Sequence, residues 1–345
     1  MTFRARFASL ASCWRKPTVK VLLLLPLSFL LLYLAFRDIS LEGFLAAFHG
    51  ARLDWIVVAI CVSTVSFFVR AARWQQLMNV DQRRVPFFDA LYGLLFGYFI
   101  NLLIPRAGEV GRCTLVARRC PIPLETAIGT VVTERLIDLL SSVIVTLLAI
   151  GVSLDRFGGF LKSRIIAPFL EKQSLVGIIV LLGVGTGLLA LVLLFWWLLR
   201  TGRLGEKRQA WWNRTREGLR QGLLSILHLH HKWGFLGYTF LLWGCYWLMA
   251  YTISLALPAT AHLGLGAALA ILVVGTFGMI VPAQGGLGSF HLAVMLWLSV
   301  EGVERTDALA YATLSHEGQV ALYIVMLIIC YVMTWRRRKH GESKE

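Results

Sequence analysis

The chain has 345 residues, 57% of them hydrophobic, with a mean hydropathy of +0.70 and a formal net charge of +15. This composition excludes a soluble globular domain and leaves no soluble part large enough to bind nucleic acid; it indicates a polytopic helical membrane protein. Because so much positive charge cannot lie in lipid, we expect it to crowd the cytoplasmic loops, where it orients the chain and attracts anionic headgroups.

A basic segment opens the chain. Residues 1–20 carry lysine and arginine without acids and precede a continuous apolar run at 21–36. That run ends in a poor cleavage site and further spans follow it, so we predict a retained first span with a cytoplasmic N-terminus. A second span is predicted at 54–74. The basic side chains that place its end in the cytoplasm are Arg70, Arg73, Arg83 and Arg84.

The next apolar stretch, 87–104, is long enough to cross most of a bilayer at about 1.5 Å per residue. A full crossing would put the basic residues that follow it outside the cell. These residues are Arg106, Arg112, Arg118 and Arg119. We therefore predict a re-entrant hairpin that enters from the cytoplasm, turns near Pro105–Gly108 and returns by Cys120 and Pro121.

Three segments lead from the first half to the second. Residues 122–152 are predicted to form one long span, and 174–199 the next, which returns to the cytoplasm. Residues 200–234 are strongly basic and are predicted to form a cytoplasmic loop with an amphipathic stretch suited to the inner membrane interface.

The second half repeats the order of the first. It has an uncharged span at 235–257, an apolar hairpin at 264–300 and a last span at 308–335, followed by a basic cytoplasmic tail at 336–345. Both flanking spans are oriented correctly only if this second hairpin enters from the side opposite to the first.

Both hairpins contain the pattern Pro-x-x-Gly-x-x-Gly. Its members are Pro105, Gly108, Gly111 and Pro282, Gly285, Gly288. The prediction is therefore a single transmembrane domain at 21–335, all-α, with about six full spans plus two oppositely oriented re-entrant hairpins. Its halves, 54–152 and 235–335, would form an inverted repeat. Inverted repeats with broken helices are a common plan of transporters, which bind substrate near the midplane.

Several charged residues lie deep in the predicted spans. Glu134 is eleven residues from Pro123, so it lies about 16 Å along its helix, near the middle of a ~30 Å apolar core. His316 and Glu317 have a similar depth in the last span. Ionisable residues in lipid are costly and normally face one another or a polar cavity.

Two interpretations of the charges in the first half stay open. In one, Arg106, Arg112 and Arg135 bind a phosphate or another anion, because the guanidinium fork binds phosphate oxygens bidentately. The acids would then order the arginines. In the other, Arg106 or Arg135 pairs with an acid and only locks the bundle. The further residues of this candidate site are Asn101, Glu109, Glu134 and Asp138.

The second hairpin offers neutral donors. Its glycines free backbone N–H groups at the start of a half-helix, which attracts anions. They equally suit close helix packing. The candidate residues are Gln284, Gly285, Gly286, Gly288, Ser289 and His291.

Other chemistry has little support. The six cysteines are scattered, the histidines of the basic loop have no acids nearby, and there is no Walker loop, G-x-S-x-G or metalloprotease motif. We therefore predict no catalytic residue, no metal and no cofactor.

Three ordered motifs resemble the lysylphosphatidylglycerol synthase transmembrane-region family, also called flippase-like, which forms the membrane part of multiple peptide resistance factors. They are Asn101-x-x-x-Pro-Arg-x-Gly-Glu-x-x-Arg112, Glu134-Arg-x-x-Asp138 and Pro282-x-x-Gly-Gly-Leu-Gly288. The resemblance covers roughly residues 20–335 and implies lipid translocation between leaflets. The family's soluble synthase domain is not expected here, and His291 stands where many members are expected to have an acid.

The sequence thus predicts a lipid flippase or transporter of the inner (plasma) membrane, multi-pass, with both termini cytoplasmic. A phospholipid or polyprenyl-phosphate-type lipid would bind by its headgroup at a midplane site between the two hairpins. The alternatives are a membrane subunit or enzyme acting on a lipid-linked phosphate, by glycosyl or aminoacyl transfer, and a lipid-binding anchor for a partner protein.

Overall fold

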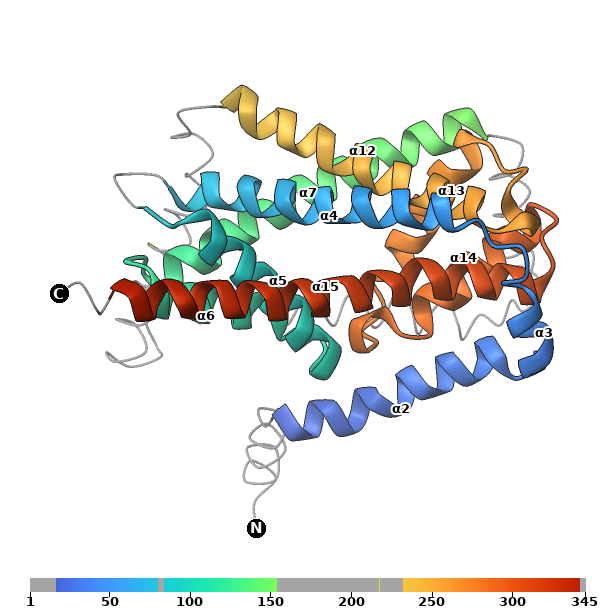
Figure 1. The fold of residues 1–345 in the computed structure, drawn as a ribbon, viewed down its shortest axis with the longest axis horizontal. Coiled ribbons are helices and arrows are strands. Elements are labelled where there is room, and N and C mark those ends of the chain that lie inside the picture. The colour runs from blue at the N-terminus through green and yellow to red at the C-terminus, as the bar shows by residue number, and fades with distance from the viewer. Residues whose placement is uncertain (1–16, 80–83, 154–216, 218–231, 342–345) are drawn as a thin grey trace, which may run out of the picture.

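The computed structural model describes residues 17–79, 84–153, 217 and 232–341, and the regular elements in these ranges are all helices (Figure 1). The predicted all-α class is therefore confirmed for them. The predicted span at 174–199 and nearly all of the basic loop at 200–234, including its amphipathic stretch, lie outside the described residues.

The helices follow one another as α2 (Pro17–Phe36), α3 (Leu41–Ala46), α4 (Leu53–Met78), α5 (Phe87–Leu103), α6 (Gly108–Arg119), α7 (Leu124–Val152), α12 (Lys232–Ala256), η2 (Pro258–Thr260), α13 (Leu265–Gly278), η3 (Gln284–Gly286), α14 (Ser289–Val300) and α15 (Arg305–Gly341).

Among the described residues, four helices are long and apolar enough to cross a membrane: α4, α7, α12 and α15. They coincide with four predicted spans. A helix of 26 residues such as α4 is about 39 Å long, more than the ~30 Å apolar core of a bilayer. The predicted first span falls in α2. The part of α2 whose side chains are described, Leu25–Phe36, is apolar but too short by itself to span a membrane.

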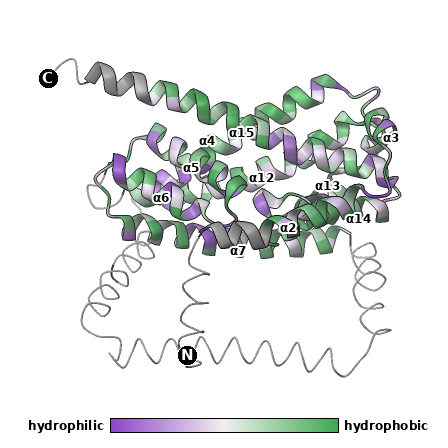
Figure 2. Ribbon diagram, turned by 90° about the horizontal axis from the view of Figure 1, so that it is seen from below, coloured by the Kyte–Doolittle hydropathy of each residue, from purple (hydrophilic) through white to green (hydrophobic). Residues whose placement is uncertain are grey.

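The outer surfaces of the long helices are apolar. On α7, Leu140 and Leu147 expose 66% and 64% of their surface, and Figure 2 shows mostly hydrophobic colour along α15. In water such a surface would be unstable, whereas in lipid it has no such cost. The fold therefore places apolar side chains outward, while Arg73, Arg112 and Glu134 are buried inside it.

A close backbone contact joins α5 to α6. A Cβ atom on Gly108 would lie 2.0 Å from the carbonyl oxygen of Gly97 and 2.6 Å from Cγ of Asn101. Asn101 Oδ1 accepts a hydrogen bond of 2.7 Å from the Gly108 N–H, so it satisfies one of the free donors at the start of α6. The turn between the helices contains Arg106 with a φ of 63°, a left-handed conformation that is unusual for a residue with a side chain.

The helices α13 and α14 form the second hairpin, and its tip meets that of the first. Gly278 packs against Ser289 and Ala293 across the pair. The tip contains Gly285, where an added Cβ would lie 3.1 Å from Leu102 at the end of α5. In Figure 1 the hairpin α5–α6 and the hairpin α13–α14 occupy opposite halves of the long axis, with their tips toward the middle.

Candidate functional site

Glu134 lies in the middle of α7 and is completely buried. Its Oε1 accepts hydrogen bonds of 3.0 Å from Nε of Arg70 and 3.3 Å from Nη2 of Arg73, both on α4. Its Oε2 accepts one of 2.7 Å from Nη2 of Arg112 on α6. One carboxylate therefore joins three helices.

Asp138, one turn further along α7, accepts a hydrogen bond of 2.7 Å from Nη2 of Arg73. The Arg112 guanidinium also stacks over the Trp74 ring, 4.5 Å from its centroid, and Trp74 Nε1 donates to Thr130 Oγ1 at 3.0 Å. Arg112 thus lies in the interior, paired with Glu134, and does not line the cavity described below. The group of Arg70, Arg73, Arg112, Glu134 and Asp138 is called the α4–α7 charge cluster below.

The burial of two arginines was not predicted. In the sequence, Arg70 and Arg73 indicate only the cytoplasmic end of a span, whereas in the structure both are buried against Glu134. A spacing of three residues puts them on one face of α4, and that face matches the i, i+4 pair of acids on α7. The sequence therefore contained a pattern that indicates this contact: two basic residues on one face of α4 and two acids on one face of α7.

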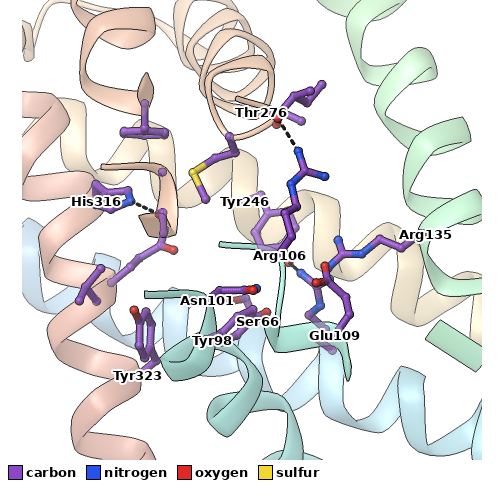
Figure 3. Close-up of a pocket in the computed structure, with 18 of the residues that line it drawn as sticks. Ser66, Tyr98, Asn101, Arg106, Glu109, Arg135, Tyr246, Thr276, His316 and Tyr323 are labelled. Atoms are coloured by element: carbon purple, nitrogen blue, oxygen red, sulfur yellow. Dashed lines mark hydrogen bonds and ion pairs between the residues drawn. The ribbon is translucent and has the colours of Figure 1, made fainter. Parts of the chain in front are cut away.

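A cavity of about 960 Å³ lies where the two hairpin tips meet (Figure 3). The charged residues of its wall are Arg70, Arg106, Glu109 and Arg135. Three arginines and one carboxylate therefore line the cavity, and Arg70 is already paired with Glu134. The single acid is paired, since Arg135 Nη2 donates to Glu109 Oε1 at 2.9 Å.

Arg106 extends from the first hairpin toward the second. Its guanidinium donates a hydrogen bond to the backbone carbonyl of Ile280, so the side chain bridges the two tips at the cavity wall. It makes no ion pair with Glu109, Glu134 or Asp138, the acids considered as its partners in the locking interpretation. Left-handed backbone conformations of residues with side chains, such as that of Arg106, occur often at ligand sites.

The rest of the cavity wall combines polar groups with apolar side chains. The polar side chains labelled in Figure 3 include Ser66, Tyr98, Asn101, Tyr246, Thr276, His316 and Tyr323. The apolar wall includes Leu136 and Leu139 of α7, which also expose 50% and 60% of their surface. The cavity wall therefore continues into the outer, apolar surface of the protein.

At the start of α14, Phe290 lines the cavity, whereas Gly288 and Ser289 do not. The backbone N–H of Gln284 donates to Ser28 Oγ on α2 at 2.8 Å, and Ser289 Oγ donates to the Gly286 carbonyl at 3.2 Å. A Cβ on Gly288 would lie 2.5 Å from the backbone nitrogen of Leu32 on α2. The glycine-rich start of this half-helix thus serves close packing at Gly288, while Gly285 and Gly286 line the cavity.

The predicted site residues therefore divide into three groups. Those at the cavity wall are Asn101, Arg106, Glu109, Arg135, Gly285, Gly286 and His316. Those in the α4–α7 charge cluster are Arg112, Glu134 and Asp138. Those elsewhere in the second half are Gln284, Gly288, Ser289, His291 and Glu317, of which the last two contact His316.

Comparison with known proteins gives the family. Residues 19–339 match the family described as lysylphosphatidylglycerol synthase TM region. The UPF0104 membrane protein MJ1595 of Methanocaldococcus jannaschii is 26% identical over 173 residues, which cover 49% of this chain and 51% of that protein. The chain thus aligns with about half the length of this relative, and no solved structure matches it. With the match extending over nearly all of the helical domain, the chain belongs to the lysylphosphatidylglycerol synthase transmembrane-region family.

Proposed function

We propose that this protein binds the headgroup of an anionic lipid, a phospholipid or a polyprenyl-phosphate-type lipid, in the cavity between the hairpin tips and moves it across the membrane. The observation that carries the proposal is the charge of the cavity wall, which contains three arginines and one carboxylate. Arg70 and Arg135 are paired with acids, whereas Arg106 makes no ion pair with the acids of the described site. Arginine binds phosphate oxygens through a planar fork of donors, so Arg106 and Arg135 suit a phosphate group.

The α4–α7 charge cluster adds positive potential behind this wall. It combines three arginines, of which Arg70 also belongs to the wall, with two acids. Nη1 of Arg112 and Nε and Nη1 of Arg73 have no hydrogen-bond partner. In a medium of low dielectric constant this excess charge acts over a longer range than it would in water. An anion in the cavity is therefore favoured even though Arg112 does not contact it.

The continuity of the cavity with the outer surface suits an amphiphile. Leu136 and Leu139 belong both to the cavity wall and to the exposed face of α7. A lipid could place its headgroup near Arg106 while its acyl chains stay in the bilayer beside α7. Transport would then need no passage of the apolar chains through the protein.

The two hairpins supply the moving parts of the proposed mechanism. We take them as re-entrant from opposite faces of the inner membrane, with both chain termini in the cytoplasm. Because Arg106 bridges to Ile280, a rocking of one half against the other would break this contact and expose the cavity to each leaflet in turn. The protein would act as a transporter rather than an enzyme, without a cofactor of its own.

The test is a lipid-scrambling assay in proteoliposomes with fluorescent anionic and zwitterionic phospholipids. The informative variant is Arg106→Gly, because glycine accepts the φ of 63° at this position, so the fold is retained while the guanidinium is lost. We expect transport of the anionic lipid to fall at least tenfold. The control is Arg52→Ala, which removes an exposed arginine at the start of α4. Equal transport by wild type and Arg106→Gly would contradict the proposal.

A further inference from the structure

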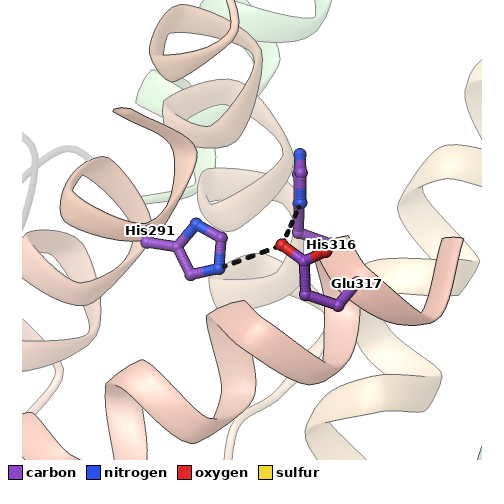
Figure 4. A group of neighbouring side chains, drawn as sticks. All are labelled: His291, His316 and Glu317. Atoms are coloured by element: carbon purple, nitrogen blue, oxygen red, sulfur yellow. Dashed lines mark hydrogen bonds and ion pairs between the residues drawn. The ribbon is translucent and has the colours of Figure 1, made fainter. Parts of the chain in front are cut away.

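Three metal-ligating side chains meet beside the second hairpin, and one of them, His316, also belongs to the cavity wall. They are His291 on α14 and the neighbours His316 and Glu317 on α15, and one ligand atom from each lies within 4.8 Å of the others (Figure 4). The two imidazole ring centroids are 5.2 Å apart.

The two contacts of the His316 ring are not both satisfied by a neutral imidazole. Its Nε2 lies 2.8 Å from the Gly285 carbonyl oxygen, and only an N–H can donate there. Its Nδ1 lies 2.9 Å from Oε1 of Glu317. In a neutral imidazole that nitrogen carries a lone pair, which would face the lone pairs of a carboxylate. Either a proton on Nδ1 or a metal ion bound to both atoms removes this conflict.

His291 provides an independent observation. Its side chain is almost completely buried, at 1% exposure, and Nδ1 has no hydrogen-bond partner. Its Nε2 is directed toward Glu317 Oε1 but stops at 3.7 Å, beyond a hydrogen bond. Nε2 therefore faces a carboxylate oxygen without a hydrogen bond, and a metal ion bound to both atoms would join them, while Nδ1 stays unpaired.

The distances fit a divalent ion. Ligand atoms about 2.1 Å from Zn²⁺ are separated by about 3.0–3.6 Å when the angle at the metal is about 90–120°. The two measured separations from Glu317 Oε1, 2.9 Å and 3.7 Å, are close to the ends of this range. A metal-ligating imidazole commonly donates its other N–H to a backbone carbonyl, as His316 does to Gly285.

We propose that Nε2 of His291, Nδ1 of His316 and a carboxylate oxygen of Glu317 bind one divalent transition-metal ion of the Zn²⁺ class, for which two imidazoles and a carboxylate are suitable ligands. The ion would join α14 to α15 and, through His316, fix Gly285 at the hairpin tip. Sequence reasoning predicted no metal because His291 is twenty-five residues from His316 and only the fold brings them together.

The test measures metal binding and does not depend on lipid transport. The protein is purified in detergent by a tag without histidine, from a background in which His228, His230 and His231 are replaced by Asn. Zn²⁺ content after dialysis is measured by elemental mass spectrometry, and Co²⁺ binding by its visible absorption. We expect about one ion per chain, since three ligands and an open position form a single site.

The decisive variant is Glu317→Ala, because this side chain is 41% exposed and its loss leaves little unfilled space. We expect at least a tenfold loss of affinity, and the same for His291→Asn. The control is His262→Gln, which changes an exposed histidine between η2 and α13 and should bind metal as the parent does. Absence of bound metal in the parent, or unchanged binding by Glu317→Ala, would overturn the proposal.

Discussion

At the scale of single residues, Glu134 meets three guanidinium groups in a part of α7 that is closed to solvent. Buried charges are tolerated only when they are paired and hydrogen-bonded. Here the pairing is shared, because the Glu134 carboxylate contacts both arginines of α4 as well as Arg112. The stability of the interior therefore depends more on this one acid than on any one arginine.

The first prediction concerns Glu134→Gln. The substitution keeps the size of the side chain but leaves Arg70, Arg73 and Arg112 close together with less compensating charge. Breaking a buried ion pair by removing one partner costs about 3–5 kcal/mol. We expect a marked fall in the thermal unfolding temperature of the purified protein. The control is Glu42→Gln on the exposed face of α3, which should change it little; equal effects of the two would contradict this role of Glu134.

The α4–α7 charge cluster also indicates what a sequence can predict at this scale. The depth of Glu134 and its shared face with Asp138 follow from helical spacing, and they identified α7 as a site of buried charge. The partners of the two acids did not follow, because Arg70 and Arg73 stand at the end of an apolar run and resemble a positive-inside signal. Only the packing of α4 on α7 shows that these arginines are partners of the buried acids and not simply the basic end of a span.

At the scale of elements, the hairpin α5–α6 depends on one close approach of backbones. Gly108 begins α6 directly against the carbonyl oxygen of Gly97, at a distance that leaves no space for a methyl group. Small residues permit this kind of packing between helices in membranes. The tip that presents Arg106 is therefore positioned by a glycine, while Asn101 fixes the first turn of α6.

The second prediction compares two glycines. In Gly108→Ala the new methyl group would overlap the Gly97 carbonyl, so the hairpin must open and thermal stability should fall. In Gly244→Ala, on α12, nothing lies within 4 Å of the new atom, and the helix should gain about 0.5–1 kcal/mol. Thermal unfolding of the two variants in detergent measures the difference. Equal stability of both would show that the contact between α5 and α6 does not fix the tip.

The repeated Pro-x-x-Gly-x-x-Gly pattern predicted both turns, because α5 ends before Pro105 and α13 ends before Pro282. The pattern did not predict which glycines pack against other helices and which line the cavity. Gly288 packs against Leu31 and Leu32 of α2, which lie more than 250 residues earlier in the chain. A contact so distant in sequence leaves no local pattern, so the anion site expected at the start of α14 could not be distinguished from a packing site.

At the scale of the whole molecule, the proposed transport requires two halves of opposite orientation. The described helices place the hairpins in opposite halves of the long axis (Figure 1), with Arg106 and Ile280 joined where the tips meet. If the hairpins enter from opposite faces of the membrane, the cavity lies near the midplane. A headgroup bound there is equally distant from both leaflets, as alternating access requires.

The third prediction tests this orientation by cysteine accessibility. In a background without the six native cysteines, single cysteines are introduced as Arg118→Cys at the end of α6 and His262→Cys before α13, both at exposed positions. A membrane-impermeant maleimide should label the first only from the cytoplasmic side and the second only from outside. Labelling of both from one side would contradict the inverted repeat.

The most direct test of the central claim, that the cavity binds an anionic headgroup, is photo-crosslinking with an anionic phospholipid that carries a photoreactive group on its acyl chain. The account predicts crosslinks on α7 near Leu136 and Leu139, competed by unlabelled anionic lipid and lost in Arg106→Gly but not in Arg52→Ala. Crosslinks spread over the outer surface and unchanged by Arg106→Gly would contradict it.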